Sequence, residues 1–211
     1  MTEAHLRLLR DPAAARAGAY LTEQRGLRPE AWAYGRLGFV PGRGYARGHG
    51  LRVPAGILIP WFCAGVLWMV NVRRPTTVPG QRYRRIAVGD GQPHQGGLYQ
   101  AWTVARGRPV LVTEGEFDAL LAYQLIGDIA GVVTPGAASN GVPARWLPLL
   151  AGAPAILSAH DADAAGQQGA ARLGALSARV RRLALPAGQD LTDFVVSGGD
   201  LRALVAGALC R

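Results

Sequence analysis

Two stretches, Val110-Leu-Val-Thr-Glu114-Gly-Glu-Phe-Asp118 and Ala155-Ile-Leu-Ser-Ala-His-Asp161-Ala-Asp163, each run from an apolar segment directly into acidic residues. Both apolar segments have the length and the unbroken hydrophobicity of a buried strand. The chain has only 14 acidic residues in all, so two such clusters are a marked concentration. They predict carboxylates gathered at neighbouring strand ends, an arrangement typical of a metal site.

The second half of the chain alternates strands and helices around these two stretches. We expect strands at 110–113, 129–133, 155–159 and 180–185, with helices at 117–126, 143–150 and 164–176. Apolar strands separated by helices predict a mainly parallel sheet covered on both faces. Ligands of such sheets bind at the carboxyl ends of the strands. Four features directly follow a strand and are expected at that one edge: Glu114, loop 135–141, Asp161 and Asp190.

The first half has a different pattern, of two helices followed by β-rich runs. Asp11 and Pro12 predict the start of a helix over residues 13–25, and a second helix is expected over 29–35. Residues 38–50 are rich in Gly and Arg without periodicity and predict a loop. The runs 56–60, 66–72 and 82–88 predict a small antiparallel sheet. We therefore expect an α/β protein, α+β overall, with domains at 1–100 and 101–211.

Composition excludes several classes of protein. The chain has 211 residues, of which 49% are hydrophobic, which is enough for a substantial core. No apolar stretch reaches the roughly 20 residues of a membrane span, and the first residues lack the apolar region of a signal peptide. We expect a cytoplasmic protein without a membrane partner. Cys63 and Cys210 are too few for a disulfide framework or a Cys-rich zinc site.

The charge of the chain is positive and comes from arginine alone. All 23 basic residues are Arg, and the net charge is +9. A GC-rich genome explains the absence of Lys as well as any function does. The sign of the charge favours a polyanionic partner, such as nucleic acid or nucleotides, because guanidinium groups bind phosphate oxygens in pairs.

The acidic residues predict the chemistry of the site. Asp161 and Asp163 are two residues apart at a strand end, and Glu114 comes from a neighbouring strand. Carboxylates held this close repel one another unless a divalent cation neutralises them, and Mg²⁺, with Mn²⁺ as an alternative, suits such oxygen ligands. The alternative is that these residues cap helices. For Asp118, in the first turn of a predicted helix, capping and metal binding remain equally open.

At this point the residues resemble a known family. The segment from Val110 to Asp118, followed by Ser-Ala-His-Asp161-Ala-Asp163-Ala-Ala-Gly166, resembles the Toprim fold of DnaG-type primases, topoisomerases and some small nucleases. Three upstream segments resemble the amino-terminal half of the catalytic core of bacterial and phage primases: Tyr20-Leu-Thr-Glu-Gln-Arg25-Gly-Leu27, Pro54-Ala-Gly-Ile-Leu-Ile-Pro60 and Gly97-Leu-Tyr99. The resemblance extends from about residue 17 to the end.

The resemblance implies a nucleotidyltransferase, a DNA-directed RNA polymerase that makes RNA primers in DNA replication from nucleoside triphosphates on single-stranded DNA. It implies that Asp161, Asp163 and Asp118 bind Mg²⁺, with Glu114 as a further ligand or as the base that helps deprotonate the attacking hydroxyl. Asp190 resembles part of a third acidic patch, and a solvated turn is its alternative.

A basic segment precedes the acidic half. We expect it to bind the template and the triphosphate, through Arg73, Arg74, Arg82, Tyr83, Arg84 and Arg85. The resemblance matches Arg73 and Tyr83 to family positions. A solvated basic strand face is the alternative.

Two departures from the family pattern affect these expectations. Where such primases carry a Lys before Leu-Tyr-Gly, this chain has His94-Gln-Gly-Gly-Leu-Tyr-Gln100. The two cysteines cannot form the zinc module of bacterial primases. We therefore expect weak or template-nonspecific synthesis by the chain alone, and a helicase or a zinc-bearing chain as a partner. The alternative functions are a Toprim metal-dependent nuclease and a nonenzymatic accessory subunit that binds single-stranded nucleic acid.

Overall fold

The structure is a computed structural model that describes residues 1–48, 51–75, 82–87 and 96–210, with the backbone alone at 43–48, 51, 52 and 87. The chain forms two compact units, Met1–Gln95 and Gly96–Arg211. The division into functional domains at residues 100 and 101 stays a prediction. Residues 49, 50 and 88, which belong to the predicted loop and third strand, lie outside the described residues, as do residues 89–95.

The amino-terminal unit begins with helical segments. They are α1 (Thr2–Arg10), the 3₁₀ turn η1 (Pro12–Ala14), α2 (Ala15–Ala19), the π-helical turn η2 (Tyr20–Gln24) and α3 (Pro29–Tyr34). The Asp11 side chain accepts a hydrogen bond from the Ala13 amide at 2.8 Å, as its capping role predicts. The single helix expected over 13–25 is wrong in form, because three helical geometries follow one another there. Gly26, at φ +63°, ends the run.

Four antiparallel strands follow: β1 (Gly38–Gly48), β2 (Leu51–Cys63), β3 (Val66–Arg73) and β4 (Tyr83–Ala87), paired in chain order. The predicted antiparallel sheet is confirmed. The predicted loop over 38–50 is wrong, because β1 pairs with β2 and its register shifts between Val40 and Tyr45. A strand can pair through its backbone hydrogen bonds without alternating apolar and polar side chains. The sequence of residues 38–50 therefore does not reveal this strand.

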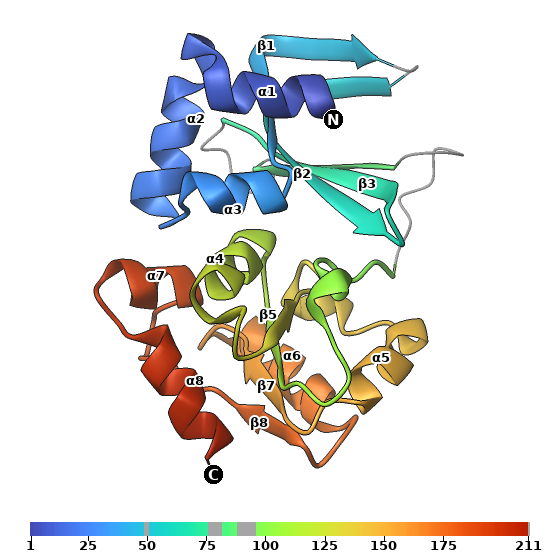
Figure 1. Ribbon diagram of the computed structural model, residues 1–211, viewed down its shortest axis with the longest axis vertical. Helices are drawn as coiled ribbons and strands as arrows, with labels where there is room; N and C mark the ends of the chain where they lie inside the picture. The colour runs from blue at the N-terminus through green and yellow to red at the C-terminus, as the bar shows by residue number, and fades with distance from the viewer. Residues whose placement is uncertain (49–50, 76–81, 88–95, 211) are drawn as a thin grey trace. The chain divides into compact units, whose positions relative to one another are not determined.

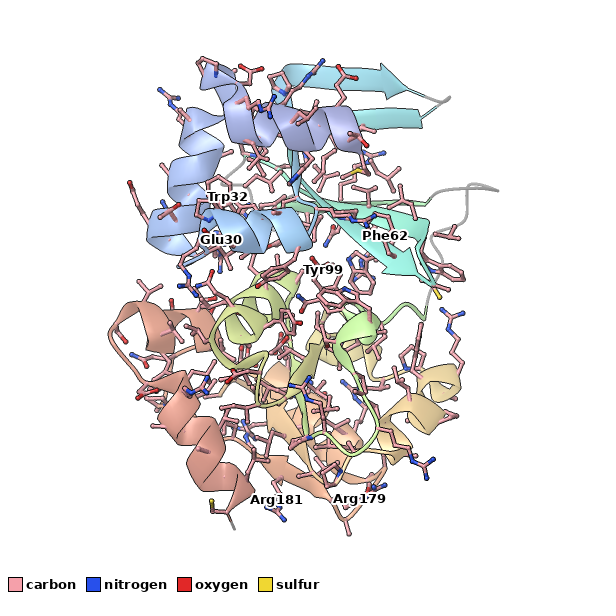
Figure 2. The ribbon with its side chains drawn as sticks, in the orientation of Figure 1. Glu30, Trp32, Phe62, Tyr99, Arg179 and Arg181 are labelled. Carbon is pink, nitrogen blue, oxygen red and sulfur yellow. The ribbon has the colours of Figure 1, made fainter. Side chains whose placement is uncertain are left out.

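Helix α1 packs on β1, and a small core forms beside it from Val40, Leu58, Val70 and Val72. Figure 1 shows the helices of this unit beside its sheet. Trp32, labelled on α3 in Figure 2, is buried and donates its indole N–H to the Leu27 carbonyl at 3.2 Å. This bond holds the chain between η2 and α3 in place.

The carboxy-terminal unit is built on four parallel strands, β5 (Val110–Thr113), β6 (Gly131–Val133), β7 (Ile156–Ala159) and β8 (Val180–Arg182), in the order β6-β5-β7-β8. Its helices are α4 (Glu116–Ile126), α5 (Leu147–Ala151), α6 (Ala164–Gly174), α7 (Leu191–Val196) and α8 (Leu201–Leu209), with 3₁₀ turns η3 (Ala101–Thr103), η4 (Ala138–Asn140) and η5 (Ala144–Trp146). The predicted parallel sheet is confirmed. Helices α7 and α8 were not predicted.

Helices cover both faces of this sheet. On one face, Val112 and Ile156 pack against Leu150 of α5 and Leu173 of α6. Because successive strand residues point to opposite faces, Leu111 lies on the other face, where α4 packs. Every residue of β5 and β7 is buried, as expected for a strand covered on two sides. Figure 1 shows this layering, and the predicted α/β fold class is confirmed. No helix in the described ranges is both long and apolar enough to cross a membrane.

Candidate active site

The predicted acidic residues all lie in the carboxy-terminal unit, at or beyond the carboxyl ends of its strands. Glu114 directly follows β5, and Asp161 follows β7 after one residue. Strands β5 and β7 are parallel neighbours, and Thr113 pairs with Ala159. The chain therefore leaves both strands side by side, which brings Glu114 and Asp161 together as the strand pattern predicts.

The Glu114 carboxylate is held by the backbone of two neighbouring loops. Its Oε2 accepts a weak hydrogen bond from the Asp161 amide at 3.5 Å, and the Ala138 amide also favours its charged form. The Thr134 hydroxyl donates to the Glu114 carbonyl at 2.8 Å. Burial, followed by repulsion from Asp163 and Asp190, raises the pKa of Glu114, although the two amides oppose the rise. Glu114 is thus a partly buried carboxylate at the centre of the edge.

Asp161 shows how closely the acidic residues are gathered. Burial is the largest cause that raises its pKa to about 7, and repulsion from four other carboxylates adds to it. Those four, in order of effect, are Glu114, Asp118, Asp190 and Asp163. They are the same residues that the sequence predicted as metal ligands. The structure therefore brings the other four within electrostatic range of Asp161.

Two of the five, Asp163 and Asp190, also cap helices. Asp163 accepts from the Gly166 amide at 2.7 Å and caps α6, and Asp190 accepts from the Asp193 amide at 2.6 Å and caps α7. Each cap uses Oδ1 of the carboxylate, which leaves Oδ2 outside the cap. Asp163 and Asp190 therefore cap helices, as the alternative to metal binding predicts. The second oxygen of each carboxylate can still bind a metal ion.

Asp118 is tied to a helix that the sequence did not predict. Its Oδ1 accepts a 2.6 Å hydrogen bond from the hydroxyl of Thr192, a buried residue of α7. Helix α7 packs against α4, which carries Asp118. The contact joins residues 74 positions apart, and no local pattern indicates it. Thr192 is therefore a residue of the site that the sequence analysis missed.

The donor set fits a hard divalent cation such as Mg²⁺ or Mn²⁺. All five side chains supply carboxylate oxygens, and the raised pKa of Asp161 shows that their charges oppose one another. Arg182 donates to the Asp161 backbone carbonyl at 3.2 Å, so this contact leaves the carboxylate itself unneutralised. As the side chains stand, the described residues contain no group of three or more His, Cys, Asp or Glu in a metal-coordinating arrangement.

His160 lies beside this edge in a buried position. Its Nδ1 is 2.9 Å from the Ser158 hydroxyl oxygen. Burial, followed by the charges of Arg182 and Arg172, lowers the pKa of His160 to about 4. Its imidazole is therefore neutral at physiological pH, and it packs against Gly169 of α6, where an added Cβ would lie 2.7 Å from its ring. This agrees with a packing role.

In the amino-terminal unit, Arg73 forms a cluster with three other side chains. Its Nε donates to the Tyr20 hydroxyl at 3.1 Å, and Arg25 donates to the same oxygen at 2.7 Å. The Arg73 guanidinium carbon also lies 5.3 Å from the ring centres of both Tyr20 and Tyr83. The structure thus brings Arg73 and Tyr83 together, as the basic segment predicts, and adds Tyr20 and Arg25.

The contact between Tyr20 and Arg25 depends on the π-helical turn. Residues five apart lie on different faces of an α-helix, whereas the i to i+5 geometry of a π-helix brings them together. The Tyr20 to Leu27 segment carried a family resemblance, but a uniform helix over 13–25 hides this contact. Only the prediction of a π-helical turn at residues 20–24 could have indicated the contact between Tyr20 and Arg25 from the sequence.

The remaining basic residues do not form one cluster. Arg73 pairs with Tyr83, Val72 with Arg84 and Asn71 with Arg85. Because directly paired residues point to the same face, Tyr83 and Arg85 share the face of Arg73, whereas Arg84 points to the opposite one. Arg82 accepts a 2.7 Å hydrogen bond from the Arg74 amide through its backbone carbonyl. All of 82–85 are exposed.

The segment that departs from the family pattern is described only in part. His94 and Gln95 lie outside the described residues. Gln100 occupies the position of the family glycine and has φ +57°, a left-handed conformation that favours Gly. Its side chain is buried, and neither polar atom of its amide has a hydrogen-bond partner among the described residues.

Comparison with solved structures finds the same fold in primases. The RNA polymerase domain of Mycobacterium tuberculosis DnaG primase matches with a TM-score of 0.76 and 19% identity, over 100% of this chain and 80% of that one. The zinc-binding and RNA polymerase domains of Aquifex aeolicus primase match with a TM-score of 0.71 and 18% identity. The primase fragment of the bacteriophage T7 primase-helicase protein matches with a TM-score of 0.68 and 19% identity, over 88% of this chain and 72% of that one.

The match to the Aquifex protein covers 95% of this chain but only 57% of that structure. No protein-family profile matches the sequence, and no curated protein is recognisably similar to it. At these identities the structural likeness establishes the fold. The chain has the fold of the catalytic cores of DnaG-type primases, and both of its units take part in the match.

Proposed function

We propose that this protein is a DnaG-like primase core that synthesises RNA primers from nucleoside triphosphates on single-stranded DNA. The observation that carries the proposal is the convergence of Glu114, Asp118, Asp161, Asp163 and Asp190 at one sheet edge. Such a set suits phosphoryl transfer, in which charge develops on phosphate oxygens and must be stabilised. The likeness to primase cores extends over the whole chain, beyond the unit that carries the carboxylates.

In this proposal the carboxylates bind Mg²⁺ or Mn²⁺, which would supply the positive charge that a triphosphate needs at an acidic edge. Asp161 and Asp163 are the principal ligands, since they follow the strand next to the one that ends at Glu114. The caps at Asp163 and Asp190 fix the orientation of each carboxylate while leaving one oxygen for a ligand. Glu114 accepts a proton from the primer hydroxyl or serves as a further ligand.

The distribution of charge supports a nucleic-acid partner for the amino-terminal unit. Residues 1–95 hold 14 arginines and five acidic residues, whereas residues 96–211 hold nine of each. The whole net charge of +9 therefore belongs to the first unit. Guanidinium groups with neighbouring tyrosine rings, as at Arg73 and Tyr83, are suited to phosphates and bases of a single strand.

The structural neighbours show the kind of ligand that this fold accepts elsewhere. The M. tuberculosis domain has been solved with double-stranded DNA that carries a 6-nucleotide overhang. The lagging-strand DNA polymerase of bacteriophage T7 has been solved interacting with the primase domains of two gp4 subunits, bound to an RNA/DNA hybrid and dTTP. We propose corresponding ligands here, and a helicase or a zinc-bearing chain as a partner in initiation.

A primer-synthesis assay tests the proposal directly. The chain is incubated with single-stranded DNA, labelled ribonucleoside triphosphates and Mg²⁺ or Mn²⁺, and the products are resolved by size. We expect short labelled products from the parent and none from Asp161→Asn, which keeps the volume of the side chain and removes its charge. Asp128→Asn is the matched control, because Asp128 pairs with Arg202 on the surface of the same unit.

The same assay separates the alternatives. Shortened DNA without labelled products would show a nuclease that uses the same carboxylates. A mobility shift alone, unchanged in Asp161→Asn, would show a nonenzymatic binding subunit. Either result would reject primer synthesis as the function.

A further inference from the structure

A cavity of the carboxy-terminal unit lies between helix α6 and the loop that follows β6. It has a volume of about 280 Å³, which is room for roughly nine water molecules of about 30 Å³ each. Pockets for drug-sized ligands start at about 300 Å³, so this cavity suits a smaller molecule. None of the five carboxylates of the acidic edge lines it.

Most of the lining of this cavity is apolar. Val112 of β5 and Leu173 of α6 line it and are buried, and Pro135 and Val142 line it from the loop side. Leu176, just beyond α6, also lines the cavity and is 48% exposed, so the cavity opens to solvent beside it. An ordered water needs two to four polar partners. A wall of this kind therefore suits the hydrocarbon part of a ligand better than it suits water.

His160 supplies a polar group to the cavity. The residue lines the cavity and is only 4% exposed. Its Nδ1 contacts Ser158, whereas its Nε2 has no hydrogen-bond partner among the described residues, although that atom is not sealed from solvent. Gly169 leaves Nε2 uncovered, because an added Cβ there would lie 3.1 Å from it. Nε2 therefore opens onto the cavity.

The contact with Ser158 determines which ring nitrogen of His160 carries the proton. Ser158 is buried, and its hydroxyl makes no other hydrogen bond within the described part of the chain. A proton on Nδ1 would leave the hydroxyl hydrogen buried without an acceptor, which is costly. The hydroxyl therefore donates to Nδ1, and the neutral ring carries its proton on Nε2. His160 thus presents an N–H donor to the cavity.

Arg172 supplies positive charge to the same cavity. It lines the cavity and donates one N–H to the Ala138 carbonyl at 2.7 Å. A guanidinium has five N–H donors, so four on Arg172 have no partner among the residues that the structure describes. Its charge lies close enough to His160 to help lower the pKa of the imidazole. Because both polar side chains offer only donors, the cavity favours an anion.

We propose that this cavity binds a small oxyanion with a short apolar body, such as a short-chain carboxylate or phosphate monoester. The oxyanion accepts hydrogen bonds from His160 and Arg172, and the apolar body lies against Val142, Leu173 and Leu176. Carboxylate and phosphate present the same paired oxygens to a guanidinium. The proposal goes beyond primer synthesis and does not depend on it, since the acidic edge takes no part in the site.

The test measures binding of small probes to the full chain by saturation-transfer NMR. The buffer is freed of divalent cations over a chelating resin, so that no soluble chelator competes. The probes are valerate, pentyl phosphate and uncharged pentanol, and inorganic phosphate is tested by its displacement of valerate. We expect valerate or pentyl phosphate to bind at least about ten-fold more tightly than pentanol and inorganic phosphate, since only the first two use both parts of the lining.

Matched variants separate this site from general attraction of anions to a basic protein. Arg172→Gln removes the charge, and Leu176→Glu places a like charge at an exposed position of the wall, so each should weaken valerate binding about ten-fold. Arg108→Gln is the control for the first, because Arg108 also donates one 2.7 Å hydrogen bond to a backbone carbonyl. Val196→Glu is the control for the second, because Val196 is 49% exposed. Neither control residue lines the cavity, so both should bind within about two-fold of the parent.

Histidine NMR of the parent gives an independent readout. The His160 signal is assigned by its loss in His160→Phe. We expect it to show the proton on Nε2 and to move when valerate is added, but not when pentanol is added. Thermal melting confirms that the variants are folded, and if one is not, the His160 signal of the parent still decides.

The outcomes are distinct. Losses in Arg172→Gln and Leu176→Glu alone support the site, and tighter binding of valerate or of pentyl phosphate identifies which oxyanion it prefers. Equal binding of pentanol or of inorganic phosphate, equal losses in Arg108→Gln and Arg172→Gln, or no binding of any probe would overturn the proposal. The assay contains neither nucleotide nor metal, so its failure and a failure of primer synthesis are separate results.

Discussion

At the scale of single residues, the acidic edge combines burial with repulsion. The pKa of Asp161 is raised to about 7, mainly by burial and then by Glu114 and its other acidic neighbours. Reference carboxyls titrate near 4. A raised pKa means that the folded protein binds the proton more tightly than the unfolded chain does. The contribution of Asp161 to stability is therefore fully present below pH 4 and is lost as the pH rises towards 7.

This gives a prediction for Asp161→Asn, whose amide is neutral at every pH. The parent and the variant should have similar stability near pH 4.5, and the variant should be more stable at pH 8 by about 1 kcal/mol or more, after allowance for solvent screening. Thermal melts across this pH range measure the difference. Two melting curves that stay parallel from pH 4.5 to 8 would show that Asp161 is not under this repulsion.

A second prediction concerns the metal. A cation that binds the folded state alone stabilises it by RT ln(1 + c/Kd), where c is the free cation concentration and Kd its dissociation constant. Millimolar Mg²⁺ or Mn²⁺ should therefore raise the melting temperature of the parent at pH 8, where Asp161 is ionised, and much less at pH 5.5, where protons compete. The rise should disappear in Asp161→Asn and persist in Asp128→Asn, the surface control. An equal rise in all three proteins would indicate nonspecific binding.

At the scale of elements, the turn from β7 into α6 positions two of the carboxylates. Gly166 lies in the first turn of α6, where Asp163 caps its amide. An added Cβ at Gly166 would lie 2.2 Å from the Asp161 carbonyl oxygen and 2.8 Å from the Asp161 amide nitrogen. The backbone of Asp161 can pass this close to the helix only because residue 166 has no side chain.

We predict that Gly166→Ala displaces Asp161 and destabilises the protein by about 1–3 kcal/mol, the usual cost of forcing atoms into a packed site. Primer synthesis should fall together with stability. Gly174→Ala is the control, because it lies in the same helix and an added Cβ meets nothing within 4 Å. It should leave stability unchanged or improve it slightly through helix propensity. Chemical denaturation of both variants compares them, and equal effects would contradict the role of Gly166.

Elements with a strong local signal were the ones that the sequence predicted well. Strand β5 and helices α4 and α6 have unbroken apolar runs or caps at their ends, and the structure confirms each of them within a few residues. Strand β1 was predicted as a loop, and α1, α7 and α8 were not predicted. Strand β1 is stabilised by its pairing with β2. The residues of β1 themselves do not indicate this pairing.

At the scale of the whole molecule, charge is divided unequally between the two units. The amino-terminal unit carries the entire net positive charge, and the carboxy-terminal unit is balanced. Phosphate contacts on a single strand release bound counterions, so the logarithm of the association constant falls with the logarithm of salt concentration by about 0.7 per contact.

If three or four arginines of the amino-terminal unit contact phosphates, binding of an oligothymidylate should weaken roughly twenty- to fifty-fold between 50 and 200 mM salt. Arg73→Ala should reduce the slope by about 0.7, and Arg10→Ala should leave it unchanged. Fluorescence anisotropy over a salt series gives these slopes. A salt-independent affinity would exclude phosphate contacts as the basis of binding.

The sequence by itself determined the class of each half, the strand ends that carry Glu114 and Asp161, and the identity of the acidic residues. It could do so because buried parallel strands need continuous apolar runs and because chain direction places every such strand end at one edge. These are properties of neighbouring residues along the chain.

Only the tertiary structure decided which distant side chains meet. The hydrogen bonds from Thr192 to Asp118 and from Arg73 to Tyr20 join residues from separate elements. Such contacts depend on register, on a π-turn and on how closely helices approach strands. Those quantities are set by packing over the whole unit, and they leave no local pattern in the sequence.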